Sequence, residues 1–268
     1  MSHDHFPEPL NRIVDDLLPL IRQLYSGKYA VAVAGSYGKK RNDGMSDIDL
    51  RAYYENWIPD TDRLTTLRQT IDLHIKDWRR QGIEIDGYWP RRISEIDDRL
   101  QSILDGSSPD PDPCIWTIWG YHLPTDLANN TIIEDPFAII STWQRQLQTY
   151  PDKLRNHMIK KHLDSALYWR HDYHYQNKVA RQDTLFCAGL ASLLAHNLVQ
   201  VIFALNRVYY SGDGWNLNYI ARFHLVPPGF CSELESVLLV GDPEQYPKQR
   251  ERLCRLIDSV EHLVKSNL

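Results

Sequence analysis

Two acidic residues separated by one apolar residue form the strongest candidate site in the sequence. They are Asp47 and Asp49, and they follow the pair Gly35-Ser36 after a gap of ten residues. If Asp47 and Asp49 lie on a strand, both side chains project from the same face, because residues two apart on a strand share a face. Carboxylate oxygens are the ligands that hard divalent cations such as Mg²⁺ prefer. The spacing therefore predicts a magnesium site.

Gly35 and Ser36 are suited to holding a phosphate group beside that metal. Glycine lets the backbone approach a ligand closely and adopt angles that are closed to other residues. The serine hydroxyl is an additional donor, and the N-terminus of a helix starting here would favour an anion. Lys39, Lys40 and Arg41 follow, and they either grip phosphates or form a solvated turn. We expect a phosphate site next to the magnesium site.

The elements that position these residues alternate between helix and strand. Residues 28–34 form a short apolar run that ends at a glycine, which is typical of a buried strand. Such alternation indicates an α/β sheet. The other expected elements are a helix over 9–25, a strand over 48–54, a helix over 60–80, a strand over 82–89, a helix over 92–104, a strand over 114–123 and an edge strand at 132–133.

The second half of the sequence favours helices. They are expected over residues 139–150, 152–178, 184–210, 232–239 and 244–264. The pattern changes at Pro136, so the expected domains are residues 1–136 and residues 137–268. The predicted fold class is an α/β (α+β) domain with a mixed sheet, followed by a C-terminal all-α helical bundle.

The motif resembles that of the nucleotidyltransferase superfamily that includes DNA polymerase beta. Within it, the sequence is similar to the small-molecule branch of aminoglycoside and lincosamide nucleotidyltransferases. The family motif is an apolar strand, Gly-Ser, a gap of about this size, and Asp-x-Asp before an apolar residue. The matching positions here are Gly35, Ser36, Asp47, Asp49 and Leu50. The resemblance covers about the first third of the chain, and a weaker similarity extends to residues 201–215.

The resemblance implies a third carboxylate on a neighbouring strand, which completes the metal site or acts as general base. Residues 83–87 offer two candidates, Glu84 and Asp86. The apolar neighbours of Glu84 fit the family pattern better, so Glu84 is preferred and Asp86 is the alternative. The choice between them stays open.

The reaction that the resemblance implies is Mg²⁺-dependent transfer of a nucleoside monophosphate to a hydroxyl of a small acceptor. The donor would be a nucleoside triphosphate (NTP), with ATP expected to supply AMP. In this interpretation Asp47 and Asp49 hold the metal, while Gly35, Ser36 and Lys39 bind the nucleotide. Two alternatives are a protein hydroxyl as the acceptor, as in antitoxin-type nucleotidyltransferases, and a nucleotide-binding or regulatory protein that has lost turnover.

Three residues of the helical half are further candidates. Relatives often carry an Arg-x-Asp near this point, which implies that Lys178, Arg181 and Asp183 face a cleft between the domains. Asp183 is equally well placed to cap the helix that starts at residue 184. In relatives, the Leu-Asn pair of the 201–215 segment is often followed by a lysine that could reach the nucleotide phosphates. This sequence has Gly214 at the corresponding place. That departure favours weaker binding of a triphosphate.

The composition narrows the class of protein. The chain has 268 residues, with 30 Lys plus Arg against 35 Asp plus Glu, for a formal net charge of -5. Nucleic acid is not an expected partner, because binding it needs clustered Lys and Arg. The four cysteines lie far apart and residues 1–10 contain no apolar signal-like stretch, so a reduced, cytoplasmic protein is expected. The oligomeric state stays open.

One stretch resembles a membrane span in length. Residues 184–206 contain no Asp, Glu, Lys or Arg. However, His196, Asn197 and Gln200 fall within it, and polar residues near the middle of a span are costly in lipid. We therefore expect a central helix that is buried by its neighbours, and no membrane partner.

Overall fold

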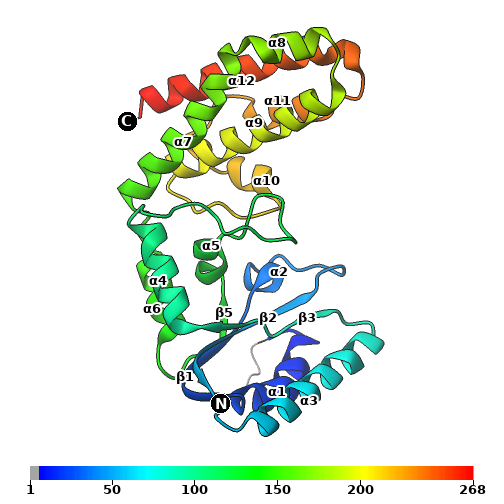
Figure 1. Cartoon of the computed structure of the whole chain (residues 1–268), viewed down its shortest axis with the longest axis vertical. Coiled ribbons are helices and arrows are strands. Elements are labelled where there is room, and N and C mark those ends of the chain that lie inside the picture. The colour runs from blue at the N-terminus through cyan, green and yellow to red at the C-terminus, as the bar shows by residue number, and fades with distance from the viewer. Residues whose placement is uncertain (1–5, 268) are drawn as a thin grey trace. The chain divides into compact units, whose positions relative to one another are not determined.

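A computed structural model describes residues 6–267 of the chain (Figure 1). It divides into two compact units. The first comprises the residues up to Gln101 together with Leu123–Thr149, and the second comprises Ser102–His122 and the residues from Tyr150 onward. Residues 1–5, part of the segment in which no signal-like stretch was found, lie outside the described residues.

This division differs from the boundary expected near Pro136, which lies inside the first unit. Helices do become dominant after Pro136, but the first of them stays with the sheet. Its Trp143 is buried against Tyr53 of the sheet, with ring centroids 4.9 Å apart. The boundary between the units therefore depends on which side chains pack together, and not on where helices replace strands in the sequence.

The first unit is built on a mixed sheet, as predicted. Its strands are β1 (Tyr25–Val33), β2 (Ile48–Trp57), β3 (Ile85–Gly87), β4 (Pro90–Arg92) and β5 (Thr131–Glu134). The strand order is β3-β2-β1-β5, and β4 also pairs with β2. β1 runs antiparallel to β2 and β5, whereas β3 and β4 run parallel to β2. The predicted edge strand at 132–133 is confirmed as β5.

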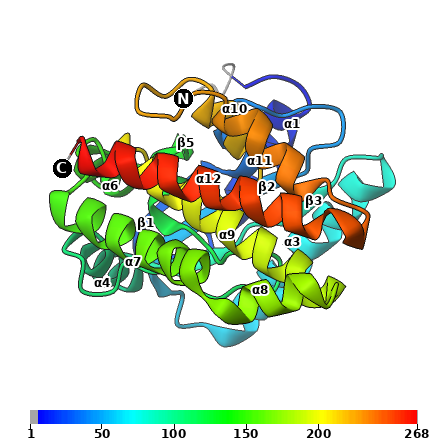
Figure 2. The same ribbon diagram turned by 90° about the horizontal axis from the view of Figure 1, so that it is seen from above.

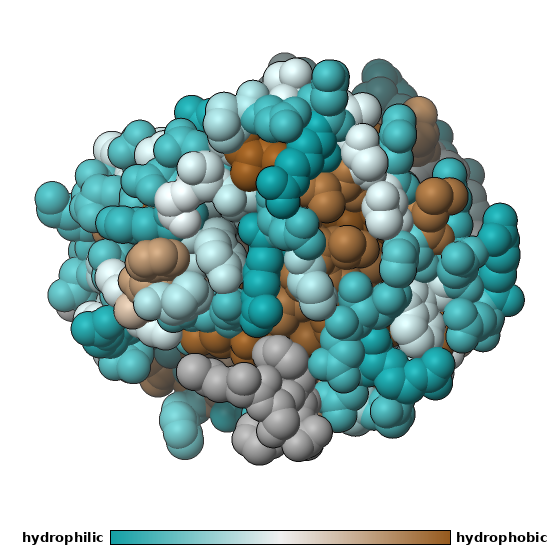
Figure 3. Space-filling view, turned by 90° about the horizontal axis from the view of Figure 1, so that it is seen from below, coloured by the Kyte–Doolittle hydropathy of each residue, from teal (hydrophilic) through white to brown (hydrophobic). Residues whose placement is uncertain are grey.

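Six helices of the described chain begin in this unit. They are α1 (Leu10–Arg22), α2 (Gly35–Gly38), α3 (Thr61–Arg80), α4 (Ile93–Leu104), α5 (Leu123–Ala128) and α6 (Ile139–Gln146). Figure 1 shows α1 and α3 on one side of the sheet and α2 and α5 on the other. The space-filling view from the side of α1 and α3 is mostly hydrophilic, with hydrophobic side chains at its centre (Figure 3).

The two faces of β2 carry different side chains, and this difference creates the site. Ile48, Leu50 and Tyr54 are buried in a hydrophobic core that also includes residues of α1 and α3. Asp49 and Arg51 alternate with them, so they project from the opposite face. The buried apolar residues anchor the strand, because each stabilises the fold by about 1.5–3 kcal/mol on burial. The polar residues are thereby held in a fixed register.

Small residues on β1 leave room for large side chains on that polar face. Ala30 of β1 pairs with Tyr53 of β2, and Ala32 pairs with Arg51. Both alanines are completely buried. Because a methyl group fills little volume, the side chains of β2 can extend over β1 here. The valines that alternate with these alanines, Val31 and Val33, belong to the core on the other side.

The second unit is helical, as predicted (Figure 2). Its elements after residue 150 are α7 (Asp152–His171), α8 (Tyr173–Ala180), α9 (Thr184–Leu205), α10 (Asn216–Ile220), α11 (Phe230–Leu238), the 3-10 helix η1 (Pro243–Gln245) and α12 (Tyr246–Lys265). α9 contacts α7, α8, α10, α11 and α12, so it is the central helix of the unit. By length and composition alone it is also apolar enough to cross a membrane, and 61% of its most apolar window is buried.

Two expectations about local structure were wrong. Residues 114–123 do not form a strand: the segment has only an isolated bridge between Asp112 and Tyr121, and α5 begins at Leu123. Its apolar composition resembles that of a strand, but Ile115 is completely exposed and no strand pairs with it in the described chain. The helix expected over 152–178 is two helices, because Asp172 is extended and accepts a hydrogen bond from Tyr175 N at the start of α8. The short strand β4 was not predicted.

Candidate active site

The Gly-Ser pair begins α2, directly after β1. Gly35 has a φ of +58°, in the left-handed region that favours glycine. A Cβ at this position would overlap the carboxylate of Asp49. The hydroxyl oxygen of Ser36 is buried and has no hydrogen-bond partner among the described residues. The turn therefore brings the backbone against Asp49 and leaves a buried hydroxyl available as a donor.

A second glycine, which the sequence analysis did not single out, packs the other end of α2. A Cβ at Gly38 would lie 2.6 Å from the carbonyl oxygen of Asn129 and 2.9 Å from that of Val33. These are backbone atoms, so they cannot move aside as a flexible side chain would. The close approach holds α2 against the segment that follows α5.

Asp47 and Asp49 lie together at the start of β2. Asp47 is exposed and immediately precedes the strand, while the side chain of Asp49 is only 16% exposed. Burial raises the pKa of Asp49, and the nearby carboxylates of Asp47, Asp126 and Asp86 raise it further, whereas Arg51 lowers it. The charged form of Asp49 is thus disfavoured by its surroundings. A bound cation would reverse that preference.

The two candidates for the third carboxylate have different surroundings. Glu84 precedes β3 and pairs with Arg79 of α3, with Arg79 Nε and Glu84 Oε1 2.8 Å apart. Its side chain is 63% exposed. Asp86 lies within β3 and is one of the carboxylates that act on Asp49. The geometry therefore favours Asp86 over the preferred Glu84, because Glu84 is engaged with a surface arginine.

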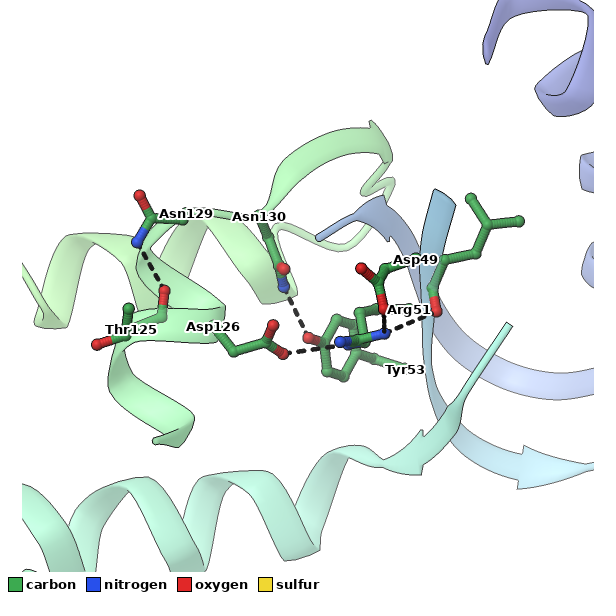
Figure 4. A network of polar contacts seen from close by, with 8 residues as sticks. Asp49, Arg51, Tyr53, Thr125, Asp126, Asn129 and Asn130 are labelled. Atoms are coloured by element: carbon green, nitrogen blue, oxygen red, sulfur yellow. Dashed lines mark hydrogen bonds and ion pairs between the residues drawn. The ribbon is translucent and has the colours of Figure 1, made fainter. Parts of the chain in front are cut away.

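Two further charged residues belong to this face and were missed from the sequence (Figure 4). Asp126 of α5 lies 3.2 Å from Arg51, measured from Oδ2 to Nε, and Arg51 Nη1 lies 3.4 Å from Asp49 Oδ1. Arg51 is two residues beyond Asp49 on the strand, so strand alternation could have identified it. Nothing in the spacing pointed to Asp126, since no helix was expected over the residues of α5.

Neutral side chains surround these charges and fix them in place. Asn130 donates from Nδ2 to the hydroxyl of Tyr53 over 2.7 Å. Gln144 of α6 donates to the carbonyl of Asn130 over 2.8 Å, and Asn129 donates to the carbonyl of Thr125 over 2.7 Å. These bonds tie α5 and α6 to the polar face of β2. They fix the position of α5, and with it Asp126, relative to β2.

Lys39 lies with the acidic residues rather than in a solvated turn. Burial lowers the pKa of Lys39, while Asp126 and Asp49 raise it and Arg41 lowers it. Lys39 therefore lies within electrostatic reach of the same carboxylates as Arg51. Asp49 and the three carboxylates near it, those of Asp47, Asp86 and Asp126, outnumber the cations Arg51 and Lys39 by two.

The donor set fits a magnesium ion that shares its ligands with a substrate. Within residues 6–267 there is no group of three or more His, Cys, Asp or Glu side chains placed to hold a metal ion by themselves. Mg²⁺ does not need such a cage, because it usually binds through one or two carboxylates, water and substrate phosphates. Asp47 and Asp49 supply two carboxylates, and the unpartnered Ser36 hydroxyl lies at the turn beside them. The residues present thus suit the ion that the motif implies.

The candidates of the second unit form a separate group. Lys178 Nζ lies 2.7 Å from Asp183 Oδ2, and Asp183 Oδ1 accepts a hydrogen bond from Phe186 N over 3.2 Å. Asp183 is thus the N-cap of α9, as one of the two interpretations predicted. Arg181 follows α8 as its C-cap residue. These contacts account for Asp183 structurally and do not require a ligand.

Comparisons with known proteins give little further information. A family described as a domain of unknown function (DUF4037) matches residues 122–216, a segment that contains Asp126 and Asp183. No curated protein matches the chain. Among solved structures, the chain is similar to a nucleotidyltransferase-like protein from Exiguobacterium sibiricum 255-15, with 12% identity and a TM-score of 0.47. That similarity covers 95% of this chain and 74% of the other. At this level it decides neither the activity nor the ligand.

Proposed function

We propose that the protein is a Mg²⁺-dependent nucleotidyltransferase that transfers a nucleoside monophosphate to a hydroxyl of a small acceptor. The observation that carries the proposal is the contact between the Gly-Ser turn and the Asp-x-Asp segment. The Gly35 turn packs directly against the Asp49 carboxylate, and the next residue, Ser36, has a buried hydroxyl with no hydrogen-bond partner among the described residues. A phosphate site and a metal site thus adjoin, which is the arrangement that a metal-bound triphosphate requires.

Each residue then has a distinct role. Asp47 and Asp49 hold Mg²⁺, which when bound neutralises charge on the triphosphate. Ser36 donates a hydrogen bond to a phosphate oxygen, and the glycine at position 35 lets the backbone come close. Lys39 adds a positive charge to the same group. These contacts orient the α-phosphorus toward the acceptor.

A carboxylate accepts the proton of the acceptor hydroxyl. The acceptor oxygen forms a bond to the α-phosphorus, the bond from that phosphorus to the bridging oxygen breaks, and pyrophosphate leaves with the electron pair. We assign the role of this proton acceptor to Asp86, because Asp86 interacts with Asp49 whereas Glu84 pairs with Arg79. ATP as donor and a small hydroxylated molecule as acceptor follow from the sequence resemblance.

Nucleotide binding tests the first part of the proposal. Thermal unfolding is measured with ATP, GTP, CTP and UTP at about 1 mM, with and without Mg²⁺. A ligand with a Kd near 10 μM adds about 2.7 kcal/mol of apparent stability under these conditions. We expect one NTP to stabilise the protein only with Mg²⁺, and Asp47→Asn to abolish the effect. Asp62→Asn, an exposed acid on α3, is the matched control and should behave like wild type.

Release of pyrophosphate tests the second part. The stabilising NTP is incubated with a panel of aminoglycosides, lincosamides and simple sugars, and the product is identified by mass. Transfer to one of these supports a small-molecule acceptor. Binding of Mg-NTP with transfer to a protein alone would favour the protein-modifying alternative. Binding without any transfer would favour a nucleotide-binding protein that lacks turnover.

A further inference from the structure

The proposed roles leave Arg51 unexplained. Its side chain is buried on the face of β2 that carries Asp49, and the residue is only 8% exposed. Ser36 and Lys39 already suit the phosphates, so a further buried cation is not needed for them. A buried charge is costly unless it is paired, so its position calls for a physical reason.

The contacts of Arg51 fix it between two carboxylates. Nε lies 3.2 Å from Asp126 Oδ2, and Nη1 lies 3.4 Å from Asp49 Oδ1. The guanidinium also lies over the ring of Trp89, 4.8 Å from its centroid. Stacking on an aromatic ring limits the orientations of the planar group. The bridge between Asp49 and Asp126 is therefore a built arrangement rather than a chance encounter of surface charges.

We propose that Arg51 is the resident counter-cation of this face, which competes with a divalent cation for Asp49. It compensates the charges of Asp49 and Asp126 while no metal is bound, and it keeps the affinity of the nucleotide-free protein for the metal ion low. The metal then binds mainly together with the NTP, whose phosphates bring additional oxygen ligands. This inference rests on the proposed function, since it assumes a metal at Asp47 and Asp49.

The test is the affinity of the nucleotide-free protein for Mn²⁺, a paramagnetic substitute for Mg²⁺ that is followed by the loss of the signal of the free ion. Arg51→Gln removes the positive charge and is expected to tighten Mn²⁺ binding at least about tenfold, because a unit charge beside a divalent ion is repelled strongly. Arg51→Lys keeps the charge and should bind Mn²⁺ as weakly as wild type. This variant separates the effect of charge from that of packing.

Arg91→Gln is the matched control. The Arg91 guanidinium lies over the same ring, 4.6 Å from the centroid of Trp89. Its loss removes the same charge and the same kind of stacking, so we expect a change in Mn²⁺ affinity of less than about threefold. The inference is overturned if Arg51→Gln binds Mn²⁺ no more tightly than wild type. It is also overturned if Arg91→Gln tightens binding as much as Arg51→Gln does.

A second pair of variants covers the case in which Arg51→Gln does not fold. Asp126→Asn keeps Arg51, while the double variant Arg51→Gln/Asp126→Asn replaces the buried pair by two neutral side chains. The double variant is expected to bind Mn²⁺ at least about tenfold more tightly than Asp126→Asn alone. Equal affinities of these two variants would contradict the inference.

Asp49→Asn separates this inference from the proposed function. If Asp49→Asn abolishes Mn²⁺ binding but Arg51→Gln changes nothing, the metal site stands and only the role of Arg51 fails. If Asp49→Asn leaves Mn²⁺ binding unchanged even with the NTP present, the metal site and the proposed function fail together. Both results are read from binding, so neither depends on finding the acceptor.

Discussion

The two units of the chain bury polar side chains in opposite ways. In the first unit charge faces charge, since Arg51 lies between Asp49 and Asp126. In the second unit the polar residues that are buried as whole residues, within the described chain, are uncharged: His162, Asn197, Gln200, Ser211 and Gln249. His162 shares a hydrogen bond of 2.8 Å with Asn197, and His196 is stacked on Trp119 with ring centroids 4.0 Å apart.

This difference suits the first unit to binding a charged ligand and the second unit to a structural role. Burial, together with the neighbouring rings of His162 and His122, lowers the pKa of His196 to about 3, so this side chain stays neutral at physiological pH. Neutral hydrogen bonds and stacked rings hold helices together but respond little to a charged ligand. Opposed charges, by contrast, can be redistributed when a cation or a phosphate arrives. Four variants test this comparison.

The largest effect is expected at Asp49. Asp49→Asn should reduce the proposed nucleotidyl transfer by at least about a hundredfold, because it removes a proposed metal ligand. The same variant should not lower the free energy of unfolding. In the wild-type protein, burial and the neighbouring carboxylates raise the pKa of Asp49. The fold therefore disfavours the charged carboxylate and tolerates a neutral amide of the same size. Transfer assays and chemical unfolding on the same preparation measure both quantities.

Asp62→Asn again provides the control for Asp49→Asn, since it removes an exposed acid of the same unit. It should leave transfer unchanged and lower stability by no more than about 1 kcal/mol, because Asp62 lies in the first turn of α3. A large loss of stability in Asp49→Asn would mean that the charged carboxylate supports the fold. Its loss of activity would then be no evidence for a metal site.

The second prediction concerns the neutral interior of the other unit. The folded pKa of His196 is about 3 and lies below the unfolded value near 6.5. Between these values the unfolded chain binds more protons, so this histidine contributes stability above pH 6.5 that is lost as the pH falls toward 3. By about pH 4.5 the loss should be about 2.7 kcal/mol. His196→Phe keeps the stacking on Trp119 and should remove this part of the acid sensitivity.

The control for His196 is His171→Phe, which makes the same change at an exposed histidine of α7. Its stability should fall with pH as steeply as that of wild type. Some acid sensitivity will remain in His196→Phe, because burial also lowers the pKa of His162. An unchanged slope in His196→Phe would show that His196 is already solvated or paired in solution.

The third prediction compares the two acids around β3. Asp86→Asn should reduce transfer at least about tenfold more than Glu84→Gln does, because a general base contributes about a hundredfold or more. Glu84 is engaged with Arg79 at the surface, so its loss should leave transfer nearly unchanged. The rates are compared at saturating NTP. A larger loss in Glu84→Gln would restore the interpretation preferred from the sequence.

The sequence was informative where local pattern decides the structure. The run from residue 28 to Gly35 and the apolar pattern after residue 48 predicted β1 and β2 correctly. Asp47 lies just before β2, so the shared face of Asp47 and Asp49 stays a prediction. Asp126 could not be found in this way. It reaches the site through the packing of α5 and through Arg51, and both are contacts between residues far apart in the chain.

The choice between Glu84 and Asp86 also depends on contacts that the sequence does not show. The apolar neighbours of Glu84 favoured it in the sequence, and only the fold brings Arg79 of α3 to Glu84. Likewise, residues 114–123 have the composition of a strand, but a strand forms only where another strand offers its backbone groups. Local pattern predicts which elements are possible, whereas tertiary contacts decide which side chains are available.

The smallest expected effect belongs to a single neutral hydrogen bond of the second unit. The hydroxyl of Ser165 accepts from Asn197 Nδ2 over 3.0 Å. Ser165→Ala should lower the free energy of unfolding by about 1 kcal/mol, the usual net contribution of such a bond. The loss should be the same at about 50 mM and about 500 mM salt, because screening acts on charges and not on this pair. Ser259→Ala, which removes an exposed hydroxyl bonded within α12, should cost less. A loss that shrinks markedly with salt would show that charge interactions contribute at Ser165, and the contrast between a charged and a neutral interior would not hold there.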